Sequence, residues 1–184
     1  MRLSPARSLV VVVLALACSD GGATSPKELR ASANRMGRHD GSIGSVAIPA
    51  PGGFSSTPLA RGTFGDDIKM TFRIKQDDKT TVVKVDDPSQ IFTGKITIAP
   101  GGALPWHTHP GPVLVTIASG ELTLVDSHRC EVRRYGTGAA FMDIGHGHVH
   151  TAFNGGSTDV VIYATYLEVP PGQSPLQPAE NPGC

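Results

Sequence analysis

The chain has 184 residues, and its 16 basic and 16 acidic side chains balance at neutral pH. This length allows one domain with a tail, and the balanced charge argues against a polyanionic partner, so we expect no nucleic-acid binding. The 22 glycines and 15 prolines, together with many short β-branched runs, predict an all-β domain rich in turns.

The N-terminus has the pattern of a targeting segment. Arg2 and Arg7 precede an apolar run that is shorter than the roughly 20 residues of a membrane span. We therefore predict a signal peptide over residues 1–18. The stretch "LALACSDGG" resembles a bacterial lipoprotein signal with Cys18 as the lipidation site, although Ala15 stands where a larger aliphatic residue is usual. The expected location is extracytoplasmic, and the membrane is met only through this lipid anchor. Plain secretion and a cytosolic protein with an apolar start are the alternatives.

Composition divides the rest of the chain. Residues 19–60 are rich in Gly, Ser, Ala and Pro and predict a flexible linker, within which "SVAIPAPGGF" can add an edge strand. The folded domain is predicted over 61–170, followed by an extended tail over 171–184. Once Cys18 is assigned to the signal, Cys130 and Cys184 form an even pair, for which an exported protein predicts a disulfide. Two free thiols are the alternative.

Alternating side chains predict strands along the domain, as in "DIKMTFRIK", "TTVVKVDD" and "SQIFTGKITIAP". The segments "GPVLVTIA" and "ELTLVD" flank Ser119 and Gly120, which predict a tight hairpin turn. Two further pairs are predicted, "CEVRRYG" with "GAAFMDI" and "HVHTAFN" with "TDVVIYATYLEV". About nine or ten short strands without a long helix predict a sandwich or a small barrel.

The histidines are clustered in the sequence. His107 and His109 are separated by one residue, so on a strand they point to the same face. His150, on another strand, can supply a third ligand. Imidazole ligands suit Zn, Fe, Cu or Ni, with Mn as a further choice. The alternative is that His107 and His109 are polar side chains at the mouth of a barrel and that His150 is a core histidine bonded to Asn154.

Two segments resemble the motifs of the cupin family. The first motif, Gly-x5-His-x-His-x3-Glu-x6-Gly, is matched by Gly101, His107, His109 and Gly120, with Val113 at the Glu position. Four residues match the second motif: Gly138, Gly147, His150 and Asn154. Gly145 stands where a proline is expected. The resemblance covers about residues 61–170 and implies a single-domain jelly-roll β-barrel, the double-stranded β-helix.

The resemblance also implies a set of site residues. The metal ligands are His107, His109 and His150, and His148 and Asn154 are candidates for residues that support them. Val113 cannot coordinate a metal, and Asp143 is the nearest carboxylate in the sequence that could replace the missing Glu.

Three functions follow as hypotheses. The first is a mononuclear metal enzyme, of the oxygenase, isomerase or hydrolase type, that uses Fe, Mn, Ni, Cu or Zn on a small molecule. The second is a non-catalytic module that binds a small molecule or the metal, and the third is a structural cupin without metal. No catalytic acid or base is identified, since neither motif holds a Glu. The family further implies a homodimer through strand edges.

Overall fold

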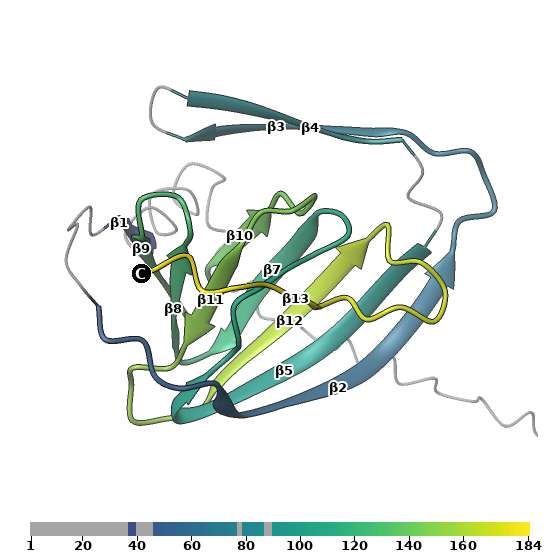
Figure 1. Ribbon diagram of the computed structural model, residues 1–184. Coiled ribbons are helices and arrows are strands. Elements are labelled where there is room, and N and C mark those ends of the chain that lie inside the picture. Colours follow the sequence, from purple (N-terminus) through teal and green to yellow (C-terminus); the bar gives the residue numbers. More distant parts are fainter. Residues whose placement is uncertain (1–36, 40–45, 77–78, 87–89) are drawn as a thin grey trace, which may run out of the picture.

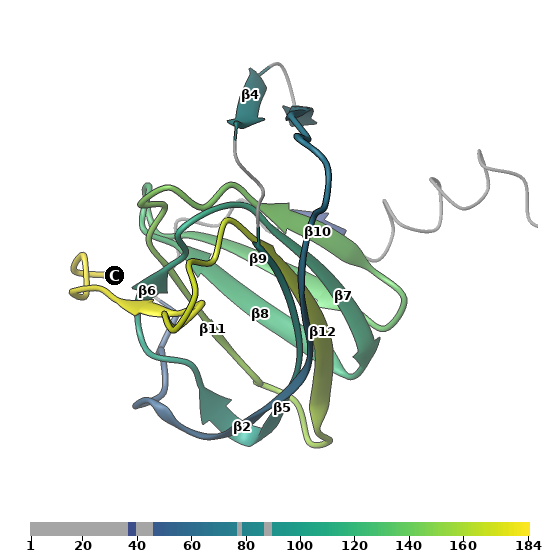
Figure 2. The same cartoon turned by 90° about the vertical axis from the view of Figure 1, so that its right-hand side faces the viewer.

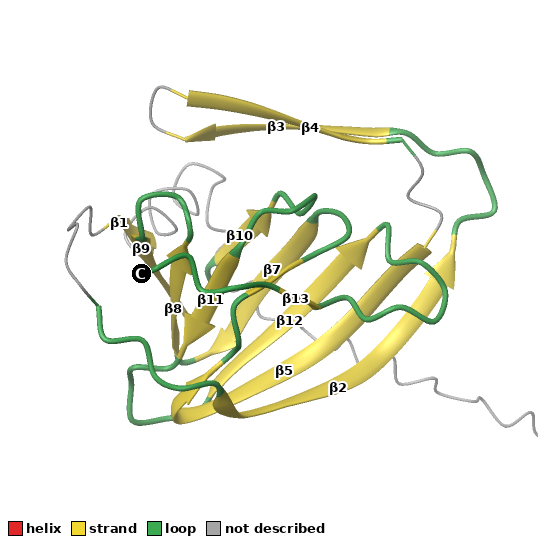
Figure 3. Ribbon diagram, viewed as in Figure 1, coloured by secondary structure: helices red, strands yellow, loops and turns green. Residues whose placement is uncertain are grey.

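The computed structural model describes residues 37–39, 46–76, 79–86 and 90–184. The predicted signal peptide, Cys18 and most of the predicted linker lie outside these ranges. The described residues form strands and loops and contain no helix (Figure 3). Accordingly, this part of the chain includes no helix with the length and apolar character needed to cross a bilayer.

Two curved sheets face each other and form a nearly closed barrel (Figure 1). The first sheet, fully antiparallel, contains in spatial order β2 (Gly52–Thr63), β5 (Gln90–Ala103), β12 (Val160–Leu167), β7 (Val113–Ser119) and β10 (Ala140–Asp143). The second contains β1 (Gly37–His39), β9 (Glu131–Gly136), β8 (Glu121–Asp126) and β11 (His150–Phe153), with β6 (His107–Thr108) and β13 (Gln177–Pro178) beyond β11. Phe153 also pairs with Ala103, so the long strand β5 connects both sheets. The predicted all-β jelly roll is confirmed.

The predicted hairpins, in contrast, are wrong. Strands β7 and β8 do not pair, because β7 lies between β12 and β10 while β8 lies between β9 and β11. The same holds for β9 with β10 and for β11 with β12. Gly120 therefore forms a corner between the sheets: its φ is 77°, and an added Cβ would lie 2.7 Å from the carbonyl oxygen of Asp159. Short turns fit both arrangements, and the burial of each strand's apolar face selects the crossing one.

The core fills the space between the sheets. Along β5 the side chains of Phe92, Ile96 and Ile98 are buried, while Thr93, Lys95 and Thr97 are half-buried, as expected for a strand with one face inward. They pack with the inward side chains of β7 and β12, among them Ile117 and Ile162. Each such side chain contributes roughly 1.5–3 kcal/mol on burial, so the barrel has a hydrophobic core that does not depend on a metal.

Two segments depart from the predicted organisation. The predicted linker ends before residue 61, because β2 already pairs with β5 from Gly52 onward. The sequence of β2 gives no alternating pattern of apolar side chains, because most of its side chains are exposed. The strand is held by its backbone pairing with β5. The predicted strands β3 (Met70–Gln76) and β4 (Lys79–Val85) exist, but they form a separate two-stranded ribbon that projects from the barrel (Figures 1 and 2).

The C-terminal tail is fastened to the barrel. Cys130 and Cys184 lie at disulfide distance, with Cα atoms 5.4 Å apart. Cys184 packs on a second apolar cluster that contains Trp106 and Phe153. The tail predicted as extended over 171–184 also contributes β13, which pairs with β6. The tail therefore runs beside the strand that carries His107.

Candidate metal centre

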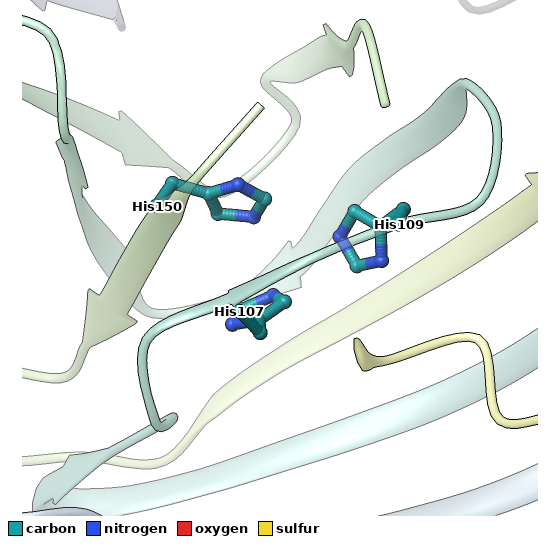
Figure 4. A group of neighbouring side chains, drawn as sticks. All are labelled: His107, His109 and His150. Atoms are coloured by element: carbon teal, nitrogen blue, oxygen red, sulfur yellow. The ribbon is translucent and has the colours of Figure 1, made fainter. Parts of the chain in front are cut away.

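Three histidines from two segments meet inside the barrel (Figure 4). His107 lies on β6 and pairs with His150, the first residue of β11, while His109 follows β6 by one residue. One ligand atom from each ring lies within 4.8 Å of the others. The ring centroids are 4.3 to 5.1 Å apart. The structure thus brings together the three side chains predicted as ligands.

Backbone carbonyls orient two of the rings. The Nδ1–H of His107 donates to the carbonyl oxygen of Pro105, and that of His109 donates to the carbonyl oxygen of Pro175, each over 2.7 Å. With the proton on Nδ1, the Nε2 atom keeps its lone pair. A hydrogen bond on the opposite ring nitrogen is the usual support of a metal-ligating histidine.

All three imidazoles are neutral at physiological pH. Burial is the main cause, and it lowers the pKa of His107 to about 3 and that of His150 to about 4, helped by the neighbouring histidines. Burial also lowers the pKa of His109. Metal ions bind only the neutral form, so the rings are in the required protonation state.

His150 also carries an unsatisfied atom. Its Nδ1 is buried and has no hydrogen-bond partner among the described residues, and the nearest carboxylate oxygen, on Asp143, is 3.4 Å away. A buried polar atom without a partner costs free energy and calls for an explanation. Three neutral imidazoles, two of them oriented by carbonyl oxygens and the third with an unsatisfied nitrogen, fit a divalent transition metal.

Val113 is flanked by two polar residues. It faces the pocket and is 1% exposed. Asp143 on β10 and Tyr166 on β12 are its cross-strand partners, and both also line the pocket. The structure therefore places a carboxylate and a phenol on either side of the position from which the Glu is missing.

The carboxylate of Asp143 is hydrogen-bonded within a network of charged side chains. Its carboxylate accepts a bond of 2.5 Å from Nδ1 of His148 and one of 2.8 Å from the backbone N–H of Gly145. The Nε2 of His148 donates to Asp126 over 2.8 Å. Burial would lower the pKa of His148, but these two carboxylates outweigh it and raise the pKa. The trio carries two negative charges and one positive charge, so one net negative charge lies beside His150.

The other predicted residues are placed as follows. His148 holds Asp126 and Asp143 and so belongs to the surroundings of the three histidines. Asn154 donates to the carbonyl oxygens of Ile98 and Thr158, which assigns it to the turn after β11 rather than to His150. Asp126 and Tyr166 belong to neither motif. Strand pairing places Asp126 opposite His150 and Tyr166 opposite Val113, and this register depends on residues distant in the sequence.

The pocket beside the histidines is mainly apolar. Among its apolar residues are Ile96, Leu122, Leu124, Phe141, Ile162 and Leu176. Its polar residues are Ser56, Asp143, Tyr166 and the three histidines, and among the described residues no lysine or arginine lines it. Such walls exclude water and favour a ligand with an apolar body.

The histidine pKa shifts predict that the metal-free protein is most stable near pH 6.5. Below this value, unfolded His107 and His150 take up protons that the folded side chains refuse until about pH 3 and 4. The free energy of unfolding therefore decreases as the pH is lowered, by up to about 1.4 kcal/mol per pH unit for each histidine. Above it, folded His148 retains a proton that the unfolded chain releases, so stability falls as the pH rises.

Urea unfolding from pH 4.5 to 9, in buffer with a chelator, measures this profile. His148→Gln should remove the alkaline decline and leave the acidic one. A profile that stays flat from pH 4.5 to 9 would contradict the assigned protonation states.

No protein-family model and no curated protein matches the sequence. The solved structures to which the chain is similar include cupin and double-stranded β-helix proteins. The polyketide cyclase RemF from Streptomyces resistomycificus is 17% identical over 74% of this chain and 80% of its own, with a TM-score of 0.45. Oxalate oxidase is 19% identical over 69% of this chain and 57% of its own, at 0.42. An uncharacterised protein with a double-stranded β-helix domain from Klebsiella pneumoniae is 23% identical over 50% of this chain and 76% of its own, at 0.42.

These likenesses concern the fold alone. Apart from β8 and β9, which pair with each other, consecutive strands from β7 to β12 lie in different sheets, and three histidines gather inside the barrel. The chain folds as a jelly-roll β-barrel of the double-stranded β-helix type.

Proposed function

We propose that this protein is an exported, metal-dependent enzyme that acts on a small, largely apolar molecule. The supporting observation is that three neutral imidazoles, a carboxylate and a phenol meet on the wall of one apolar pocket. His107, His109 and His150 would hold the ion. A divalent transition ion would supply a Lewis acid with coordination positions left open for a ligand.

Tyr166 and Asp143 have different roles. Burial raises the pKa of Tyr166, so its phenol stays protonated and its O–H can donate to a ligand oxygen. Its ring lies 5.3 Å from that of His109. Asp143 is held by His148 and Gly145, and these bonds lower its pKa against the opposing effect of burial. It therefore supplies negative charge beside the ion and is a weak base.

The pocket walls define the substrate class. Apolar side chains dominate them, and among the described residues no cationic side chain is present to neutralise a second anionic group. The ligand is therefore an apolar body with one oxygen or sulfur donor, and dianions and phosphates are disfavoured. The Cys130–Cys184 pair and the predicted signal peptide support export, because disulfides persist in oxidising compartments.

A non-catalytic binding module is the second candidate. The observation that favours it is the engagement of Asp143 by two donors, which leaves the pocket without a free carboxylate base among the described residues. Such a module would bind the same metal and the same ligand class without turnover.

Elemental mass spectrometry of the untagged protein is the first test. We expect about one equivalent of a single transition metal, since one cluster of three histidines is present. Calorimetry on the loaded protein should then show that 4-phenylbutyrate binds more tightly than succinate, by about tenfold or more. Absence of metal, also after titration with Fe(II), Mn(II), Ni(II), Cu(II) and Zn(II), would refute the proposal. Binding without turnover of any apolar ligand would support the second candidate.

A further inference from the structure

The last ten residues, 175–184, which we call the strap, run along the segment that carries His107 and His109 (Figure 2). Gln177 and Pro178 pair with Thr108 and His107 as strand β13 on β6. The backbone N–H of Ala179 donates to the carbonyl oxygen of Trp106 over 3.0 Å. The strap therefore forms an added edge strand beside the first histidine motif.

The strap also holds one of the ligands. The carbonyl oxygen of Pro175 accepts the Nδ1–H of His109, at 2.7 Å, across 66 residues of sequence. His107 differs in this respect, because its acceptor is Pro105, two residues earlier in the same segment. Only the His109 support depends on a distant part of the chain.

Two anchors keep the strap in place. At its start, Leu176 packs against the main core and lines the pocket. At its end, Cys184 is joined to Cys130 and packs in the cluster around Trp106. Between these anchors the side chains of Gln177, Pro178 and Glu180 are exposed, so the position of the strap rests on its ends and on the few backbone bonds to β6.

We infer that the strap is a working part of the metal centre: its Pro175 carbonyl positions His109 for metal binding, and the Cys130–Cys184 bond keeps that carbonyl in place. The metal-affinity part of this inference rests on the proposed function. The positioning part concerns the metal-free protein and stands independently. In consequence, the tail that the cupin motifs leave out is needed for a complete site.

The test uses the full-length double variant Cys130→Ser with Cys184→Ser. In this variant the C-terminal end of the strap is no longer joined to Cys130. Long-range ¹H–¹⁵N spectra of the metal-free protein at pH 7.5 report which ring nitrogen of each histidine carries the proton. In the parent protein, His107 and His109 should both be protonated at Nδ1. In the variant, His109 should become a mixture of tautomers while His107 is unchanged. Glu180→Ala, an exposed change within the strap, is the control and should alter neither.

Metal affinity, measured by chelator competition, gives the second readout. The double variant should bind the metal about 10-fold to 100-fold more weakly, as is usual when the support of a ligating histidine is lost. Leu176→Ser keeps the disulfide but removes the apolar anchor at the start of the strap. If the double variant does not fold, the His109 tautomer and the metal affinity are measured on Leu176→Ser instead. An unchanged His109 tautomer in the folded variants would overturn the inference, even if no metal bound. Failure of metal binding in the parent protein would refute only the proposed function.

Discussion

His107→Ala and His150→Ala should each lose the bound metal while the barrel stays folded. Each variant removes one of three ligands, and loss of a direct ligand should weaken binding by more than about 100-fold, beyond the effect of removing a supporting group. The fold should survive, because the hydrophobic core between the sheets does not include these side chains. Metal content by elemental mass spectrometry and the dissociation constant by chelator competition measure the loss.

Thermal unfolding gives an independent readout of the same variants. An ion at 100 times its dissociation constant stabilises the native state by about 2.7 kcal/mol. This gain should be present in the parent protein and absent from both variants. His128→Ala is the matched control, since His128 is exposed and only its backbone N–H is bonded to Asp126. Metal content in His107→Ala or His150→Ala equal to that of the control would rule out the ligand assignment.

Asp143→Asn should destabilise the metal-free protein by about 1.5–3 kcal/mol, the usual contribution of a hydrogen bond to a charged group. Asp143 is 4% exposed, and its carboxylate faces the imidazolium of His148 and the N–H of Gly145. An amide retains the shape but carries no charge, so His148 keeps only Asp126 as a charged partner. Denaturant unfolding at pH 7 measures the loss, and metal affinity should fall by about 10-fold or more because His150 loses its neighbouring carboxylate.

Glu168→Gln provides a matched control for Asp143→Asn. Glu168 also pairs with a histidine at 2.7 Å, but His146 there is 46% exposed. A solvent-exposed pair contributes less than about 1 kcal/mol. The double variant Asp143→Asn with His148→Gln should lose less stability than the sum of the two single changes, since both single changes break the same bond between Asp143 and His148. A cost for Asp143→Asn as small as that of Glu168→Gln would mean that the trio does not act as a unit.

The role of Asp143 illustrates how far the sequence could lead. Its carboxylate was the nearest candidate to replace the missing Glu, on distance along the chain alone. The structure places it directly across from Val113, on the neighbouring strand. It is not among the three histidine ligands but lies 3.4 Å from Nδ1 of His150, and together with His148 and His150 it forms a second group that could hold a metal ion. Strand register, which depends on pairing with a distant strand, decided between these roles.

The sequence by itself determined the local features of this protein. Alternation of apolar side chains located the strands of four or more residues from β3 to β12, and the spacing of His107 and His109 fixed two side chains on one face, because these properties depend only on neighbouring residues. The second motif added His150, and the count of cysteines paired Cys130 with Cys184. These predictions needed no knowledge of which strands pair.

The tertiary structure decided which strands meet and what surrounds the histidines. The same short turns serve hairpins and crossings, so only the folded chain shows that β8 and β9 pair while β7 and β8, β9 and β10, and β11 and β12 lie in different sheets. Strand β2, with mostly exposed side chains, owes its order to the backbone of β5. The trio of Asp126, His148 and Asp143 and the bond from His109 to Pro175 join residues distant in sequence. Charge compensation and ligand positioning act through space, and therefore only the folded chain defines them.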